Sequence, residues 1–297
     1  MISLFFNSQH ELRSGWKFAI FVVILLPVWI ASHLSLTLIF AATFGIEDPL
    51  NALLVNVLAS CISATVATVF VARIVERVPL QVMGIGFQSG WNGNLKTGVA
   101  IGSTLIVLTM LGALAFGETQ VEWTFSQDST SQMALTLGIL IVAAAFEELV
   151  FRGYPLQILI KGIGPWKAIL VMSCIFGMLH AQNPNSSRLG IFNTIVAGVM
   201  LSLAYWKTRS LWFSYGLHLA WNVGLGMVVG FPLSGLGVAS LWTTRVTGPS
   251  SIIGGEYGPE GGVLGTIIFI VGAIAVWRIP VQRINYDDRI YKDSGAG

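Results

Sequence analysis

Residues 133–152 read MALTLGILIVAAAFEELVFR, in which an uncharged apolar run is followed by two glutamates and an arginine. The apolar character continues to about residue 160, and a helix that crosses a membrane needs about 20 such residues. Ionisable side chains inside an apolar run are costly in a bilayer, so they are functional candidates by default. This stretch therefore predicts a membrane helix that carries chemistry, and it indicates the fold class of the whole chain.

The remainder of the chain has the same apolar character. Hydrophobic residues make up 54% of the 297 residues and charged residues only 10%, whereas soluble domains carry roughly 25% charged residues. A soluble fold of this size could not hide so much apolar surface. We therefore predict an all-α polytopic membrane protein with about eight transmembrane helices, in which Pro155 kinks or ends the fourth helix early. Besides the run at 133–160, the apolar runs lie at 18–43, 51–72, 97–116, 166–181, 189–206, 211–230 and 262–278.

The distribution of lysine and arginine predicts how these helices are oriented. Cytoplasmic connections are enriched in Lys and Arg, and the chain fits that rule if both termini are cytoplasmic. Arg188 and Arg245 then lie outside, Arg152 stays in a helix, and the other basic residues lie inside. The inside set is Arg13, Lys17, Arg73, Arg77, Lys96, Lys161, Lys167, Lys207, Arg209, Arg278, Arg283, Arg289 and Lys292. The first run is too long for the apolar part of a cleavable signal, which spans roughly 7–15 residues, so we expect an integral protein of the plasma membrane.

Two classes of site and partner are excluded by simple counts. The net charge of +2 is too small to indicate a nucleic-acid partner. The two cysteines, Cys61 and Cys174, lie inside apolar runs and fit neither a metal-binding pattern nor a disulfide scaffold. The partner that the composition indicates is the lipid bilayer.

The chain divides into three parts. Residues 1–132 hold three predicted spans, residues 133–230 hold most of the polar side chains that lie within apolar runs, and residues 231–297 hold a long connection, the last span and a tail. The connection, at 231–262, is rich in Gly and Ser and does not match a phosphate-binding loop. Two interpretations stay open for it: a flexible extracytoplasmic connector, or a re-entrant lid over a site.

The two adjacent glutamates have different environments on a helix. Glu147 and Glu148 point about 100° apart, so they cannot easily share one role. Glu148 and Arg152 have the i, i+4 spacing that favours an ion pair, which gives Glu148 a structural role and leaves Glu147 for solvent or substrate. The alternative is a buried bridge that only joins two helices.

Further polar side chains lie in the later apolar runs. His180 closes the run at 166–181, where it can cap a helix C-terminus or serve a site. His218 and Asn222 share one helical face at i, i+4. Both can donate hydrogen bonds to one point, as an oxyanion hole requires, or they can join neighbouring helices. We interpret His33, in the first run, as a hydrogen-bonded structural residue.

Three motifs in order resemble the CPBP family of CAAX proteases and bacteriocin-processing enzymes. They are EExxxR at 147–152, FxxxH at 176–180 and HxxxN at 218–222. The eukaryotic members of that family are the type II CAAX prenyl endopeptidases. The resemblance makes 133–230 a CAAX-protease-like catalytic core, and it implies an eight-helix fold around a conical cavity inside the membrane.

The resemblance also implies a role for each motif residue. Glu147 activates a water molecule with help from His180. His218 and Asn222 stabilise the tetrahedral oxyanion. The remaining pair, Glu148 and Arg152, supports the site. The implied reaction is hydrolysis of a peptide bond near the C-terminus of a protein or peptide, for which a prenylated CAAX protein is the best-known substrate of the family.

Metal dependence is a separate question. Glu147, His180 and His218 could bind zinc with water in the fourth position. However, no HExxH helix is present, and a general-base glutamate needs no metal. We therefore favour a mechanism without a cofactor and keep zinc as the alternative.

Two other function classes also fit a membrane cavity with buried charges. One is a non-catalytic bacteriocin-immunity or scaffold protein that binds a partner in the same cavity. The other is a proton-coupled transporter that uses Glu147, Glu148 and Arg152 as a relay. Transporters often contain inverted repeats, and the sequence shows none.

Overall fold

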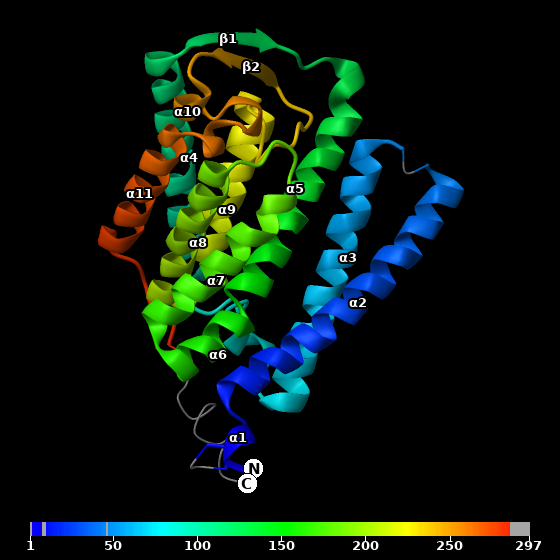
Figure 1. The fold of residues 1–297 in the computed structure, drawn as a ribbon, viewed down its shortest axis with the longest axis vertical. Coiled ribbons are helices and arrows are strands. Elements are labelled where there is room, and N and C mark those ends of the chain that lie inside the picture. Colours follow the sequence, from blue (N-terminus) through cyan, green and yellow to red (C-terminus); the bar gives the residue numbers. More distant parts are fainter. Residues whose placement is uncertain (1, 8–9, 46, 286–297) are drawn as a thin grey trace.

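The computed structural model describes residues 2–7, 10–45 and 47–285, and these are mostly helical (Figure 1). The long helices are α2 (Ser14–Thr43), α3 (Pro49–Phe70), α4 (Trp91–Phe116), α5 (Thr130–Phe151) and α8 (Arg188–Thr208). The shorter helices are α1 (Ile2–Phe5), α6 (Tyr154–Ile163), α7 (Pro165–Leu179), α9 (Leu211–Asn222), α10 (Ser250–Ile253) and α11 (Val263–Arg278). Two of the basic residues assigned to the cytoplasmic side, Arg289 and Lys292, lie outside the described residues.

Irregular helical segments and one small sheet connect these helices. The π-helical segments Val71–Val75 and Val223–Val229 continue α3 and α9. Short 3-10 turns lie at Leu80–Met83, Gln127–Ser129, His180–Gln182, Gly255–Tyr257 and Pro259–Gly261. The strands β1 (Glu118–Trp123) and β2 (Trp242–Thr247) form an antiparallel pair, in which Glu118 faces Thr247 and Trp123 faces Trp242.

All eight predicted apolar runs contain helices, but they are not all complete spans. Among the described residues, five helical stretches are long and apolar enough to cross a membrane: Ser14–Thr43, Pro49–Val75, Trp91–Phe116, Thr130–Ile163 and Arg188–Thr208. The prediction of an α-helical membrane protein is therefore confirmed, while eight full spans are not shown. The reason is length. Helix α7 has 15 residues, which gives about 22 Å, short of the roughly 30 Å of a hydrocarbon core.

The fourth run is interrupted where the proline predicted it. Helix α5 ends at Phe151, and α6 begins at Tyr154 with Pro155 as its second residue. Proline lacks an N–H group, and the first turn of a helix leaves its N–H groups unpaired, so Pro155 fits the start of a helix and not its interior. The predicted early end of the fourth helix is confirmed.

The outer face of α2 is apolar and open. Leu38 is 72% exposed, Val23 is 68% exposed and Leu34 is 59% exposed. Soluble monomers rarely show contiguous apolar patches of this kind. Lipid is the environment in which such a face is stable.

Close packing of α4 against α9 fixes the position of the helix that carries His218. A Cβ atom on Gly98 would lie 2.3 Å from the carbonyl oxygen of Phe213, and one on Gly216 would lie 2.5 Å from that of Leu95. Small residues at helix interfaces in membranes let backbones approach in this way. Helix α9 is therefore held against α4 by backbone contact.

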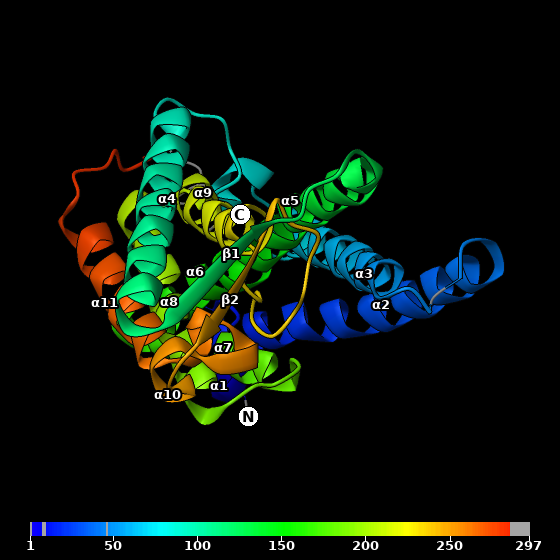
Figure 2. The same ribbon diagram turned by 90° about the horizontal axis from the view of Figure 1, so that it is seen from above.

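The remaining helices complete the bundle. Helix α8 packs against α7, α9 and α11, while α2 packs mainly on α3. Figure 2 shows β1 and β2 crossing over one end of the bundle, with α2 and α3 projecting to one side. In Figure 1 this sheet lies at the end opposite α1 and α6.

Candidate active site

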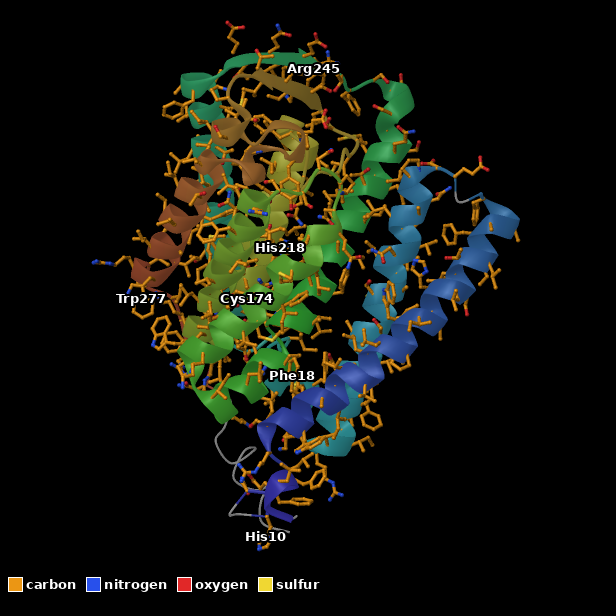
Figure 3. All side chains as sticks on the ribbon, viewed as in Figure 1. His10, Phe18, Cys174, His218, Arg245 and Trp277 are labelled. Atoms are coloured by element: carbon orange, nitrogen blue, oxygen red, sulfur yellow. The ribbon has the colours of Figure 1, made fainter. Side chains whose placement is uncertain are left out.

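A cavity of about 200 Å³ lies between the helices and contains the four predicted active-site residues. Glu147 of α5, His180 at the end of α7, and His218 and Asn222 of α9 all line it. Figure 3 shows His218 in the interior of the bundle, between Arg245 at the sheet end and Phe18 near the other end. The residues come from three helices that are far apart in sequence, as the motifs require.

A buried ion pair forms one side of the site. Arg152 Nη1 donates to Glu148 Oε1 over 3.1 Å, and each side chain is only 1% exposed. Arg152 Nη2 lies 3.5 Å from the carbonyl oxygen of Gly198, and its guanidinium carbon lies 4.4 Å from the centre of the Phe176 ring. The predicted i, i+4 pair is present, and the pair does not line the cavity.

His218 links this ion pair to the other glutamate. Its Nδ1 lies 2.9 Å from Glu148 Oε1, and its Nε2 lies 3.8 Å from Glu147 Oε2. Because Glu148 is paired with Arg152, its carboxylate accepts, and we assign the Nδ1 proton of His218 to this bond. The bond orients the ring and leaves Nε2 on the side of Glu147.

Glu147 has a carboxylate oxygen that the protein does not satisfy. Its Oε2 is buried and accepts no hydrogen bond from any described residue, while the side chain as a whole is 19% exposed. A buried acceptor without a partner is destabilising by about 1–3 kcal/mol. Such an oxygen, at the wall of a cavity, is suited to a water molecule or a substrate group.

His180 closes α7 and lines the cavity at the same time. Its Nδ1 lies 2.8 Å from the carbonyl oxygen of Phe176. A carbonyl can only accept, so Nδ1 carries the proton and the neutral ring has a free lone pair on Nε2. The helix-capping interpretation and the active-site interpretation of His180 are therefore compatible.

Phe176 has a role in the site that the sequence analysis did not assign. The centre of its ring lies 4.5 Å from that of His180 and 6.4 Å from that of His218. It therefore contacts both imidazoles as well as the guanidinium of Arg152. The four-residue spacing of Phe176 and His180 was visible in the sequence, but the packing of the ring against α5 and α9 was not.

Glu260 is a second residue that sequence reasoning missed. It lines the cavity and is 7% exposed. Trp221 Nε1 donates to its Oε1 over 2.8 Å, and the backbone N–H and the hydroxyl of Ser234 donate to its Oε2 over 2.6 and 2.7 Å. The only sequence signal was an acidic residue among glycines, which ordinarily marks a solvent-exposed turn.

The segment 231–262 is a folded cover and not a loose connector. Leu233, Ser234 and Glu260 line the cavity, and Asn183 Nδ2 donates to the carbonyl oxygen of Ser234 over 3.1 Å. Asn193 Nδ2 also donates to the carbonyl oxygen of Glu260 over 2.8 Å. The lid interpretation of this segment is the one that the contacts support, and we call residues 231–262 the lid.

His33 lies apart from this arrangement. It pairs with Thr37 at 3.5 Å and lies against the ring of Trp29, as expected of a structural residue. Within the part of the chain that the structure describes, no group of three His, Cys, Asp or Glu side chains is arranged to hold a metal ion.

Comparison with known protein families agrees with the motifs. Residues 129–224 match the family model described as "Type II CAAX prenyl endopeptidase Rce1-like". The matched segment contains all three motifs and runs from the start of α5 to the end of α9. This segment therefore matches the CAAX protease family, and the resemblance that the three motifs indicated is confirmed. A comparison with curated proteins gives no match.

Proposed function

We propose that this chain is an intramembrane endopeptidase of the CAAX protease type, which hydrolyses a peptide bond within its cavity. One observation carries the proposal. The unsatisfied carboxylate oxygen of Glu147, the imidazoles of His180 and His218 and the amide of Asn222 line one cavity. General-base catalysis requires a carboxylate within reach of the water that it activates.

The proposed reaction begins with water on the Glu147 carboxylate. Glu147 takes a proton from this water while the water oxygen attacks the carbonyl carbon of the substrate. His180 accepts a hydrogen bond from the water through its free Nε2, which orients the lone pair that attacks. The C–N bond then breaks, and Glu147 passes its proton to the leaving amine. The products are a new carboxylic acid, which keeps the second proton of the water until it ionises, and a new amine.

His218 and Asn222 are the proposed donors to the tetrahedral oxyanion. Asn222 offers its amide N–H, and a protonated His218 offers Nε2–H while Nδ1–H stays on Glu148. The carboxylates of Glu147 and Glu148 both lie near this imidazole. Donors aimed at the developing charge typically contribute about 10²–10³ in rate.

The substrate is proposed at the level of its class. A protein or peptide is cut near its C-terminus, and a prenylated CAAX-type C-terminus is the candidate that the description of the family suggests. The cavity lining combines a majority of apolar side chains with nine polar ones. This composition suits an extended peptide with apolar side chains.

We propose a mechanism without a metal because a general-base glutamate needs none. Dialysis of the purified protein against a chelator, with zinc restored in a parallel sample, tests this choice. Activity that is unchanged by chelation supports the proposal. Activity that is lost on chelation and returns with zinc contradicts it.

The function itself is tested by comparing C-terminal peptides from cells that contain the wild-type chain or Glu147→Gln. Glu122→Gln is the matched control, because Glu122 lies exposed on β1, away from the cavity. We expect C-terminal peptides that are present with wild type and Glu122→Gln and absent with Glu147→Gln. Identical peptide sets in all three strains would count against a protease.

The two rival functions have their own signatures. A scaffold or immunity protein predicts that Glu147→Ala keeps full biological activity. A proton-coupled transporter predicts proton flux in proteoliposomes that depends on Glu147. Either result would replace the proposal with the corresponding rival.

A further inference from the structure

Asn222, one of the two proposed oxyanion donors, has no side-chain hydrogen bond within the part of the chain that the structure describes. In the last two turns of α9, such bonds are formed by Tyr215, His218 and Trp221, and Asn222 takes part in none of them. The other proposed donor, His218, is held by Glu148 at 2.9 Å. The position of the Asn222 amide therefore depends on how the end of α9 is held.

The helix changes its geometry directly after this residue. Helix α9 ends at Asn222, and the π-helical segment Val223–Val229 follows it. π-Helical turns are rare and occur frequently at functional sites. Because no regular α-helical turn follows Asn222, contacts from neighbouring elements have to fix the end of α9.

Trp221, the residue before Asn222, makes such contacts on two sides. It is only 4% exposed, and the centre of its ring lies 4.9 Å from that of Phe269 on α11. Its Nε1 donates to Glu260 Oε1 in the lid over 2.8 Å. A buried indole usually donates its N–H in this way. Packing against α11 and the hydrogen bond to the lid together fix the turn of α9 that carries Asn222.

Glu260 is itself held by two other parts of the fold. The backbone N–H and the hydroxyl of Ser234 donate to its Oε2 over 2.6 and 2.7 Å. Asn193 of α8 donates to its carbonyl oxygen over 2.8 Å. Three donors, counting Trp221, thus face a carboxylate, which only accepts when it is ionised. The lid and α8 thereby hold the end of α9 through one buried side chain.

We infer that Glu260 is a positioning residue for the oxyanion donor: it holds Trp221, and Trp221 sets the position of the Asn222 amide in the cavity. Such a role has a large effect, because a displacement of about 1 Å can lower a rate by about 10²-fold even when its cause lies away from the chemistry. The catalytic consequence rests on the proposed function, whereas the link from Glu260 to Trp221 does not.

A cycle of single and double variants tests this role. Trp221→Phe keeps a ring and removes the N–H that reaches Glu260. Trp212→Phe is the matched control, because Trp212 donates from its indole to the carbonyl oxygen of Gly86 over 2.9 Å near the start of α9, outside the cavity. We expect Trp221→Phe to lower kcat by up to about 10²-fold with little change in KM, and Trp212→Phe to leave kcat unchanged. In a chain that already carries Asn222→Ala, Trp221→Phe should cause no further loss, because residues that act as a unit are not additive. An equal fold-loss in both backgrounds overturns the inference.

Hydrogen exchange separates this inference from the proposed function. Exchange in residues 219–229 is measured for purified wild type, Trp221→Phe and Trp212→Phe. Glu260→Ala, which removes the acceptor, is the second variant in both measurements. We expect faster exchange for Trp221→Phe and Glu260→Ala only. Unchanged exchange in these two variants overturns the inference, even where the wild type cleaves peptides. Faster exchange together with no cleavage by the wild type overturns the proposed function and leaves the link from Glu260 to Trp221 standing.

Discussion

At the residue scale, the proposed site depends on two adjacent glutamates, Glu147 and Glu148, whose carboxylates have different environments. Glu148 is held by Arg152 and His218, whereas Glu147 keeps a buried oxygen without a partner from the protein. The sequence predicted this division from spacing alone. The sequence did not predict Glu260, because its three hydrogen bonds come from α9 and from another part of the lid, and no local pattern encodes such contacts.

Replacing Arg152 should destabilise the fold strongly. Arg152→Met leaves Glu148 as a buried charge without its main partner, and such losses cost about 3–5 kcal/mol. Thermal unfolding in detergent measures the effect, with Arg245→Met, at an exposed position on β2, as the control. A double variant, Glu148→Leu with Arg152→Met, should recover much of the loss. Equal melting temperatures for Arg152→Met and the control contradict this account of the ion pair.

Removing the proposed oxyanion donor should affect rate much more than stability. Asn222→Ala is expected to lower kcat by about 10²–10³ with little change in thermal unfolding, since Asn222 is only partly buried. Steady-state kinetics on a cleaved peptide gives the answer. A rise in KM with an unchanged kcat would show that Asn222 binds the ground state equally well, and the assigned role would be wrong.

At the element scale, the positions of the helices followed from the sequence better than their lengths did. Apolar runs predicted every long helix, and Pro155 predicted the break between α5 and α6. The run at 166–181 was already short for a span, and α7 is correspondingly short, whereas the π-helical ends of α3 and α9 were not predicted. These features depend on packing and on the lid, which supplies polar groups where α7 and α9 end.

Contact between α4 and α9 should be sensitive to one methyl group. In Gly98→Ala the new Cβ would meet the carbonyl oxygen of Phe213, and forced overpacking typically costs about 1–3 kcal/mol. Gly138→Ala on α5 is the control, because a Cβ there meets nothing within 4 Å. We expect lower thermal stability and lower activity for Gly98→Ala only. Comparable stability of the two variants would mean that α9 is not held by this contact.

The lid should loosen when its buried carboxylate is replaced. Both oxygens of Glu260 accept hydrogen bonds, so the amide group of Glu260→Gln must face at least one donor. Hydrogen exchange in residues 231–262 is expected to rise, and activity to fall. Glu256→Gln, at an exposed position of the lid, should leave both unchanged. Unaltered exchange in Glu260→Gln contradicts the latching role of Glu260.

At the scale of the whole molecule, the cavity forms between helices and a lid that are far apart in the sequence. The Lys and Arg distribution was available from the sequence, but the place of the cavity within the fold was not. That place depends on the lid, which lines the cavity, and on the packing of the helices around the buried Glu148–Arg152 pair. The orientation of the chain in the membrane remains a prediction.

Peptide-bond hydrolysis that depends on Glu147 is tested most directly by tracing the oxygen of the attacking water into the product. Membranes with wild-type chain, Glu122→Gln or Glu147→Gln are incubated in ¹⁸O-labelled water, and new C-termini are identified by mass spectrometry. We expect one ¹⁸O atom in new carboxylates for wild type and Glu122→Gln, and no such termini for Glu147→Gln. Equal amounts of labelled termini in all three samples would contradict it.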